Sequence, residues 1–205
     1  MKTVIIDYGL GNLRSVQKAL ESLGFSAEIS ADLQVISAAD KIILPGVGAF
    51  PLAMENLRKK NLLQPLLAGL CDKPFLVICL GMQLLLTVSE EFGVTAGLNA
   101  VAGRVQSFRK AAGFPAELSV PHMGWNDVRQ LKQSLLFQKL PAQFSAYFVH
   151  SYYVLPDAAE VTAGVTDYGI EFCSALETGN LYGVQFHPEK SGQAGLEILR
   201  NFLEL

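Results

Sequence analysis

Short apolar runs of strand length alternate with amphipathic helical patterns through the first ninety residues of this 205-residue chain. In the segment 12–23, for example, apolar side chains recur every three or four positions, as on one face of a helix, and Gly24 fits a helix end. The alternation predicts strands at 3–7, 25–29, 41–44 and 74–79, and helices at 12–23, 52–60, 62–70 and 82–88. Strands that alternate with helices in this way form a parallel sheet covered by helices on both faces.

The pattern changes after Glu91, where strand-like segments follow one another with turns between them. The expected strands are 101–108, 118–121, 146–155, 161–165, 171–176 and 181–185, and a helix at 191–203 closes the chain. We therefore expect a flavodoxin-like, three-layer α/β fold, with an open, mostly parallel sheet, helices on both faces and an antiparallel extension in the second half. No repeat or linker interrupts the pattern, so a single domain over 1–205 is expected.

Composition disfavours several classes of protein. Half of the residues are hydrophobic, the net charge is −3, and the basic residues form only short clusters, so neither disorder nor nucleic-acid binding is expected. No apolar stretch reaches the length of a membrane span. The cysteines Cys71, Cys79 and Cys173 lack paired spacing, which favours a reducing, cytoplasmic location. Cys71 and Cys173 are expected to be structural, and neither a metal nor another cofactor is expected.

The clearest chemical signal is the segment Val77-Ile78-Cys79-Leu80-Gly81-Met82-Gln83. A buried strand leads into a cysteine and a helix begins directly after it, which is the arrangement of a nucleophile elbow. The positive end of the following helix would favour the thiolate of Cys79, and Gly81 would allow the close approach that such a turn needs. The alternative is that Cys79 is a small apolar residue at the end of a core strand.

A second signal is Gly183-Val184-Gln185-Phe186-His187-Pro188-Glu189, far downstream. Pro188 favours an extended backbone, in which His187 and Glu189 project to similar sides. Glu189 could then orient the imidazole, as the third group of a catalytic triad does. Strand ends of a parallel sheet converge on one edge, where His187 could meet Cys79. A surface histidine–glutamate pair is the alternative interpretation.

Two glycine-containing turns follow predicted strands. Leu44-Pro45-Gly46-Val47-Gly48 could turn backbone N–H groups inward to form an oxyanion hole, although a Pro-Gly turn is also ordinary loop chemistry. Gly9-Leu10-Gly11-Asn12 could cradle a phosphate. However, Arg14 stands where the third glycine of G-x-G-x-x-G would be, and no P-loop lysine follows, so nucleotide binding is disfavoured.

The glycine turn, the cysteine elbow and His-x-Glu, in this order, resemble the class I (triad) glutamine amidotransferases. Within that superfamily, further segments are similar to the glutaminase subunits of imidazole glycerol phosphate synthase: 6–13, 121–126, 147–152 and 187–192. The resemblance spans nearly the whole chain. It implies that Cys79 attacks the side-chain amide of glutamine, with His187 transferring protons. One departure is Val77, a β-branched residue where the superfamily commonly has a small one, which could crowd the elbow.

The resemblance also implies roles for residues around the triad. Backbone N–H groups at Val47, Gly48 and Leu80 would hold the oxyanion. The implied glutamine-binding residues are Gly46, Gln83, His150, Ser151 and Tyr152. Ammonia would pass to a separate cyclase subunit with a (β/α)₈ barrel fold, and the candidates for the docking face or the ammonia gate are Asn12, Trp125, Asn126, Tyr147 and Lys190.

Three alternatives remain open from the sequence. The chain could be a glutaminase that serves anthranilate, pyridoxal phosphate or nucleotide synthesis, a cysteine peptidase or deglycase-like hydrolase of related fold, or a catalytically inactive binding module. Glutamate release from glutamine, with and without a cyclase, distinguishes the enzymes. Selective alkylation of Cys79 would count against the inactive module.

Overall fold

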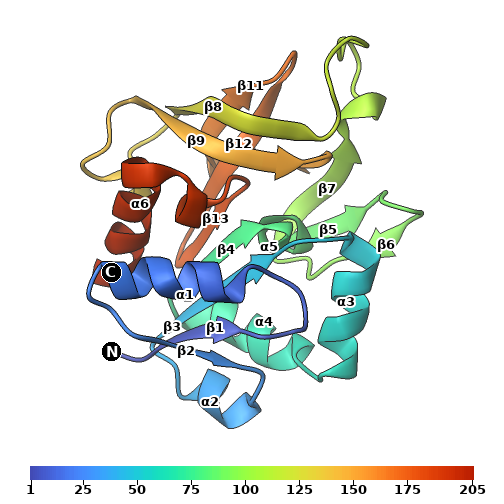
Figure 1. Cartoon of the computed structure of the whole chain (residues 1–205). Coiled ribbons are helices and arrows are strands. Elements are labelled where there is room, and N and C mark those ends of the chain that lie inside the picture. Colours follow the sequence, from blue (N-terminus) through green and yellow to red (C-terminus); the bar gives the residue numbers. More distant parts are fainter.

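The computed structural model shows one 13-stranded sheet with helices packed against it (Figure 1). It describes residues 1–70 and 72–205, so Cys71 and its expected structural role lie outside the described residues. The strands are β1 (Thr3–Ile6), β2 (Ala27–Ser30), β3 (Lys41–Gly46), β4 (Phe75–Cys79), β5 (Leu86–Ser89), β6 (Thr95–Ala96), β7 (Val101–Ser107), β8 (His122–Gln130), β9 (Gln143–His150), β10 (Tyr152–Pro156), β11 (Thr162–Asp167), β12 (Glu171–Thr178) and β13 (Leu181–Val184). The α-helices are α1 (Leu13–Ser22), α2 (Leu33–Ser37), α3 (Phe50–Lys59), α4 (Leu63–Asp72), α5 (Leu80–Leu84) and α6 (Gly192–Glu204).

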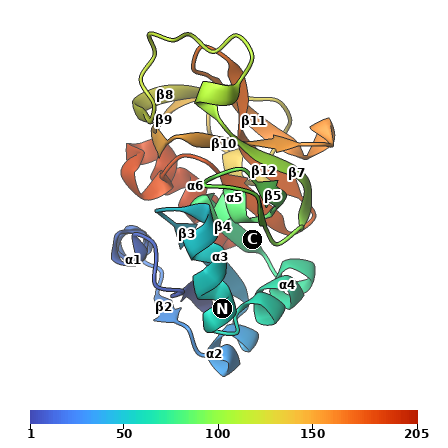
Figure 2. The ribbon, with the colours of Figure 1, turned by 90° about the vertical axis from the view of Figure 1, so that its right-hand side faces the viewer.

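One half of the sheet is parallel, in the order β2-β1-β3-β4-β13. Strands β1, β3 and β4 are buried along their whole length, which explains their continuous apolar runs. Successive side chains of these strands point to opposite faces of the sheet, where they pack into two separate hydrophobic cores. Helices α1 and α6 pack on one face of the sheet, and α2, α3 and α4 pack on the other. Figure 2 shows α1 and α4 on opposite sides of the strands.

Beyond β13 the sheet continues through β12, β10 and β7, which pair antiparallel. Strands β5 and β6 complete that edge, with β5 parallel to β7. Strands β11, β8 and β9 branch from β12 and form the upper part of the molecule in Figure 1. The expected three-layer α/β fold with an antiparallel extension is confirmed.

Strand order brings three chain segments to one edge of the sheet. β4 lies between β3 and β13, with Gly46 opposite Cys79 on one side and Val184 opposite Ile78 on the other. The carboxyl ends of these parallel strands therefore deliver Cys79, the turn after Gly46 and the segment after Val184 to the same place. Ligand sites of open α/β sheets lie at such an edge.

Some expected elements are wrong. The helix expected at 82–88 ends at Leu84, and residues 86–89 form strand β5 because Leu86 and Val88 pair with β7. The segment 118–121 is a loop, and the strand begins only at His122. The strand expected at 146–155 is two strands, β9 and β10, separated at Ser151. Helix α2, which the sequence analysis did not predict, begins where the Asp32 carboxylate accepts from two backbone N–H groups.

Candidate active site

Cys79 occupies a strained turn between strand β4 and helix α5. Its backbone has φ +55° and ψ −111°, a combination that non-glycine residues rarely adopt. A Cβ atom on Gly81 would lie 2.1 Å from the carbonyl oxygen of Leu44, so only glycine fits there. Val77 is fully buried opposite Gly183, and the turn is formed with Val77 in place. The structure thus has the geometry of a nucleophile elbow, which exposes the atom at its apex above the sheet edge.

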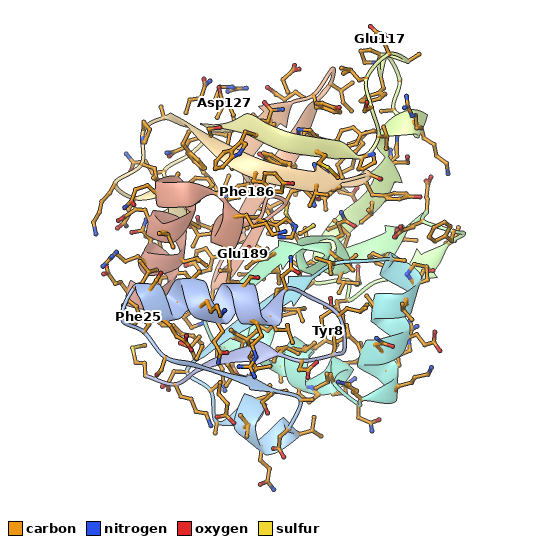
Figure 3. The ribbon with its side chains drawn as sticks, in the orientation of Figure 1. Tyr8, Phe25, Glu117, Asp127, Phe186 and Glu189 are labelled. Carbon is orange, nitrogen blue, oxygen red and sulfur yellow. The ribbon has the colours of Figure 1, made fainter. Side chains whose placement is uncertain are left out.

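His187 and Glu189 form a buried pair. Nδ1 of His187 lies 2.8 Å from Oε1 of Glu189, and both side chains are almost fully enclosed. Figure 3 places Glu189 near the middle of the molecule in this view, between helix α1 and strands β8 and β9. Because a carboxylate only accepts, the proton of a neutral His187 ring resides on Nδ1, and Nε2 remains for the chemistry.

The backbone of His187 is held by strand β9 and by Ser191. His187 N donates to Tyr147 O at 2.9 Å, and Tyr147 N donates to Ser191 Oγ at 2.9 Å. Ser191 Oγ in turn donates to His187 O at 2.7 Å. This ring of bonds fixes the histidine relative to the antiparallel strands. The sequence analysis assigned no role to Ser191, because a serine just before a helix is usually an ordinary helix N-cap.

The surroundings of His187 favour its protonated form. Burial alone lowers the pKa of His187, but its interactions with Cys79 and Glu189 outweigh burial and raise the pKa to about 10. Cys79 and His187 both line one cavity, so the thiol and the imidazole lie in the same site. A protonated imidazole beside a sulfur atom is ready to give its proton to a leaving group.

Cys79 and His187 open into a cavity of about 700 Å³. The residues predicted for the site that line this cavity are Asn12, Val47, Gly48, Cys79, Leu80, Gln83, His150, Ser151, Tyr152, His187 and Lys190. Glu189 lies behind His187, away from the cavity lining. A concave site of this size with convergent polar groups suits a small molecule.

Residues 4–205 match the family model described as glutamine amidotransferase class-I. The chain belongs to this family. Among the similar proteins, the imidazole glycerol phosphate synthase subunit HisH of Moorella thermoacetica is 51% identical over 203 residues, which cover 98% of this chain and 93% of the relative. The protein of the same description from Methanosarcina mazei is 51% identical over 208 residues, covering 100% and 98%. The resemblance identified from the motifs is confirmed.

Solved structures support the fold of this amidotransferase. One described as a glutamine amidotransferase superposes with a TM-score of 0.74 at 16% identity, covering 98% of this chain and 97% of that one. PurLQS from Thermotoga maritima gives a TM-score of 0.69 at 16% identity, covering 99% and 97%. At such low identity the likeness concerns the fold alone.

Gly46, another residue predicted to bind the substrate, is buried and is not among the residues that line the cavity. A Cβ atom at this position would lie 2.5 Å from the Tyr8 hydroxyl and 2.8 Å from Gly81 N. Gly46 therefore allows strand β3 to pass close to the elbow, and the residues after it reach the cavity instead.

Glu91 is a cavity residue that the sequence analysis missed. It is the one carboxylate among the cavity-lining residues, and its Oε2 accepts from Phe50 N at 2.7 Å. Burial raises the pKa of Glu91, and the Phe50 N–H partly offsets this. No periodicity or motif marks Glu91 in the sequence. Its position in the cavity depends on the pairing of the preceding strand, β5, with β7.

Two of the candidate docking residues, Trp125 and Asn126, project from opposite faces of strand β8. Trp125 is 59% exposed and Met123 is 62% exposed, and both project from the same face. The Trp125 ring packs edge-on against Tyr147 with centroids 6.2 Å apart, and Lys190 Nζ lies 5.8 Å from the Tyr147 ring centroid. Figure 3 shows Asp127, two residues further along, at the outer edge of the molecule.

Asn126 projects from the opposite face of β8. Its side-chain Nδ2 donates to Asp167 O at 2.8 Å and lies 3.2 Å from His122 Nε2. Its amide is thus occupied within this chain, whereas Trp125 and Met123 are open to solvent. An exposed aromatic and methionine pair is typical of a protein interface.

The other described cysteine, Cys173, is buried, and burial raises the pKa of its thiol to about 12. This is consistent with the structural role expected for it. Within residues 1–70 and 72–205 there is no cluster of histidine, cysteine and acidic side chains suited to a metal ion. In the same part of the chain no helix has the length and hydrophobicity needed to cross a membrane.

Proposed function

We propose that this chain is the glutaminase subunit of imidazole glycerol phosphate synthase, acting in histidine biosynthesis in the cytoplasm as one domain over 1–205. The observation that carries the proposal is that Cys79 and His187 line one cavity, with Glu189 bonded to His187 from behind. Relatives named HisH that match nearly the full chain support this assignment over glutaminases of other pathways. The family match disfavours an unrelated cysteine hydrolase.

The proposed reaction gives each member of the triad a distinct role, and His187 acts in both steps. The Cys79 thiolate attacks the side-chain amide carbon of glutamine, and the carbon–nitrogen bond breaks as His187 gives its proton to the departing ammonia. Water then loses a proton to His187 and hydrolyses the thioester to glutamate. Glu189 orients the imidazole and stabilises its charge. Backbone N–H groups at Val47, Gly48 and Leu80 would hold the oxyanion.

Glutamine would bind with its amide at the elbow and its amino-acid end further out in the cavity. Glu91 is suited to the α-ammonium group, because it is the carboxylate on the cavity wall. The remaining polar groups for glutamine are Gln83, His150, Ser151 and Tyr152. Gly46 would contribute only by bringing strand β3 close to the elbow.

Ammonia formed here would pass to a cyclase subunit with a (β/α)₈ barrel fold, which would form imidazole glycerol phosphate and aminoimidazole carboxamide ribotide. The exposed face of Trp125 and Met123, with Tyr147 and Lys190 beside it, is the docking surface that we propose. Asn12 and Lys190 also line the cavity and are therefore candidates for the ammonia exit. Asn126 would support the docking strand from its inner side.

The substitution Cys79→Ala tests the proposal. It should reduce glutamine hydrolysis by at least about a thousandfold, because the nucleophile is lost. The complex with the cyclase should still use free ammonia. The measurement is glutamate release, and cyclase turnover with added ammonium salt.

Cys173→Ala is the matched control, since Cys173 is also buried and unpaired but lies away from the cavity. It should keep most of its glutaminase activity. Glutamine hydrolysis that persists in Cys79→Ala would contradict the assignment of the nucleophile. If neither variant supported cyclase turnover with added ammonia, the assignment of the cyclase as the partner would be contradicted.

A further inference from the structure

Gln185 is a fully buried polar residue that the reaction above does not use. It follows strand β13, two positions before His187, and its Nε2 donates to Cys79 Sγ at 3.6 Å. The other end of the amide, Oε1, accepts from Gln83 Nε2 at 3.2 Å. The Gln185 side chain therefore contacts the reacting sulfur directly.

The carbonyl oxygen of Tyr152 determines how these amides are oriented. A carbonyl oxygen can only accept, so Gln83 must direct its Nε2 toward it, at 3.1 Å. The second N–H of that nitrogen then requires an acceptor, which is Gln185 Oε1. As a result Gln185 faces the sulfur with a donor and not with an oxygen.

The same carbonyl ends a chain of two imidazoles. His150 Nδ1 lies 2.8 Å from Tyr152 O, and His150 Nε2 lies 3.0 Å from His122 Nδ1. At the far end, Asn126 Nδ2 lies 3.2 Å from His122 Nε2. Burial lowers the pKa of His122 to about 4 and that of His150 to about 3, so each ring carries a single proton at neutral pH.

One arrangement of protons satisfies every contact of this chain. Because Tyr152 O accepts, the proton of His150 is on Nδ1 and its Nε2 must accept. His122 then carries its proton on Nδ1, and its Nε2 accepts from Asn126. The Asn126 amide is oriented by Asp127 N, which donates to its Oδ1 at 2.8 Å. All bonds therefore run in one direction, from strand β8 toward Tyr152.

Resting on the function proposed above, we propose that Gln185 is a catalytic residue that donates a hydrogen bond to the Cys79 thiolate. His122 and His150 are positioning residues, which anchor the Tyr152 carbonyl that orients the amides. A donor to an anionic sulfur is stronger than one to a neutral thiol, so the bond favours the reactive form. This chain of hydrogen bonds, which we call the relay, begins at Asn126 on strand β8, the strand that also presents Trp125 to solvent.

Gln185→Met removes the donor and keeps a side chain of similar length. The rate constant for iodoacetamide alkylation of Cys79 at pH 7 should fall about tenfold, the usual effect of losing one hydrogen bond to a charged group. The kcat for glutamine should fall similarly, with a smaller change in KM. Gln185→Glu, which is isosteric and retains an acceptor for Gln83, should also slow alkylation, because it places an acid beside the sulfur. Circular dichroism establishes that each full-length variant is folded.

Gln130→Met is the matched control, since the Gln130 amide donates to Pro141 O at 2.8 Å, away from the cavity. It should alkylate at the wild-type rate. A folded Gln185→Met with wild-type alkylation and kcat would overturn the role of Gln185, and Gln185→Glu decides the same question if the methionine variant does not fold. Neither result would affect the test of Cys79→Ala, which addresses the proposed function separately.

The positioning role of His122 is tested by a pair of variants. His122→Phe preserves a ring but cannot donate to His150, and kcat should fall severalfold. His122→Asn can place its amide nitrogen near the position of Nδ1 and should restore most of the loss. Nitrogen-15 NMR of the wild-type histidines should show His122 and His150 both protonated on Nδ1 at pH 7. A His150 proton on Nε2, or equal kcat in the two variants, would overturn the relay.

Discussion

At the scale of single residues, the site depends on a backbone strain that neighbouring glycines make possible. A non-glycine residue in the conformation of Cys79 costs of order 1–3 kcal/mol, and the structure around it must enforce that conformation. Gly81 does so by permitting Leu44 O to approach the elbow, and Gly46 does so on the adjoining strand. The conformation of the reactive Cys79 is thus made possible by two glycines, Gly81 and Gly46.

Gly81→Ala should prevent the elbow from forming. The new Cβ would lie 2.1 Å from Leu44 O, which is a backbone atom and cannot move alone. We expect a loss of about 2 kcal/mol or more in the free energy of unfolding and slow alkylation of Cys79, measured by urea titration and iodoacetamide labelling. Gly179→Ala, whose Cβ meets no atom within 4 Å, should lose about 1 kcal/mol and remain active. Equal effects in both variants would refute the steric argument.

Glu91→Gln should weaken glutamine binding more than it slows chemistry. Removing the charge that faces the α-ammonium group should raise KM about tenfold or more, with a smaller change in kcat. The matched control is Glu90→Gln, whose carboxylate pairs with Lys110 at 2.9 Å. Steady-state kinetics with glutamine distinguish the two, and an unchanged KM in Glu91→Gln would contradict its role.

The motifs allowed the elbow cysteine and the histidine–glutamate pair to be predicted, because each rests on local spacing. They did not predict Glu91, Gln185 or Ser191. These residues reach the site through strand pairing between distant segments, and nothing in their immediate neighbours indicates it. Gly46 belongs to a motif, and the structure shows that its lack of a side chain also serves the packing of strand β3 against the elbow.

At the scale of elements, the parallel half was predictable and the antiparallel half only in part. The buried strands β1, β3 and β4 have continuous apolar runs, whereas residues 82–88 combine helical spacing with a segment that becomes β5. Pairing with β7 decides that segment, and local propensity is too weak to show it. The loop 118–121 was mistaken for a strand for the same reason, since apolar content alone cannot indicate a partner.

Strand β8 provides the prediction at this scale. Trp125→Ala should weaken binding of the cyclase subunit by about tenfold or more, because large exposed aromatics supply much of the energy of an interface. Isothermal titration calorimetry measures the effect. Leu131→Ala, just beyond the other end of β8 and also exposed, should bind normally. Wild-type affinity in Trp125→Ala would place the docking surface elsewhere.

At the scale of the whole molecule, the sheet separates two hydrophobic cores. His122 and His150 are buried in this fold, and burial lowers the pKa of both rings. The folded-state pKa values of His122 and His150, about 4 and about 3, lie below the ordinary value of 6.5. The unfolded chain therefore binds protons on these rings first as the pH falls. Stability from the pair is present above pH 6.5 and declines as the pH falls toward the folded-state values.

Acid should therefore destabilise the protein before most carboxylates titrate. At pH 5 each ring should lower the free energy of unfolding by about 2 kcal/mol relative to pH 7. His187, whose pKa is raised in the folded state, acts in the opposite direction: its stabilisation increases slightly as the pH falls through 6.5 and is constant below that range, so it offsets only part of the loss. Urea unfolding from pH 7 to 5 measures the slope, and His122→Phe should reduce it. A flat profile in this range would contradict neutral, buried rings.

Strand β13 lies between β4 and β12, so the sheet is completed only by a segment from the last quarter of the chain. A ribosome making this protein would release β4 and its cysteine long before the neighbour that carries the histidine emerges. Until then, the nascent chain would have an unpaired strand edge and no working centre. Glutaminase activity is thus postponed until synthesis is nearly complete.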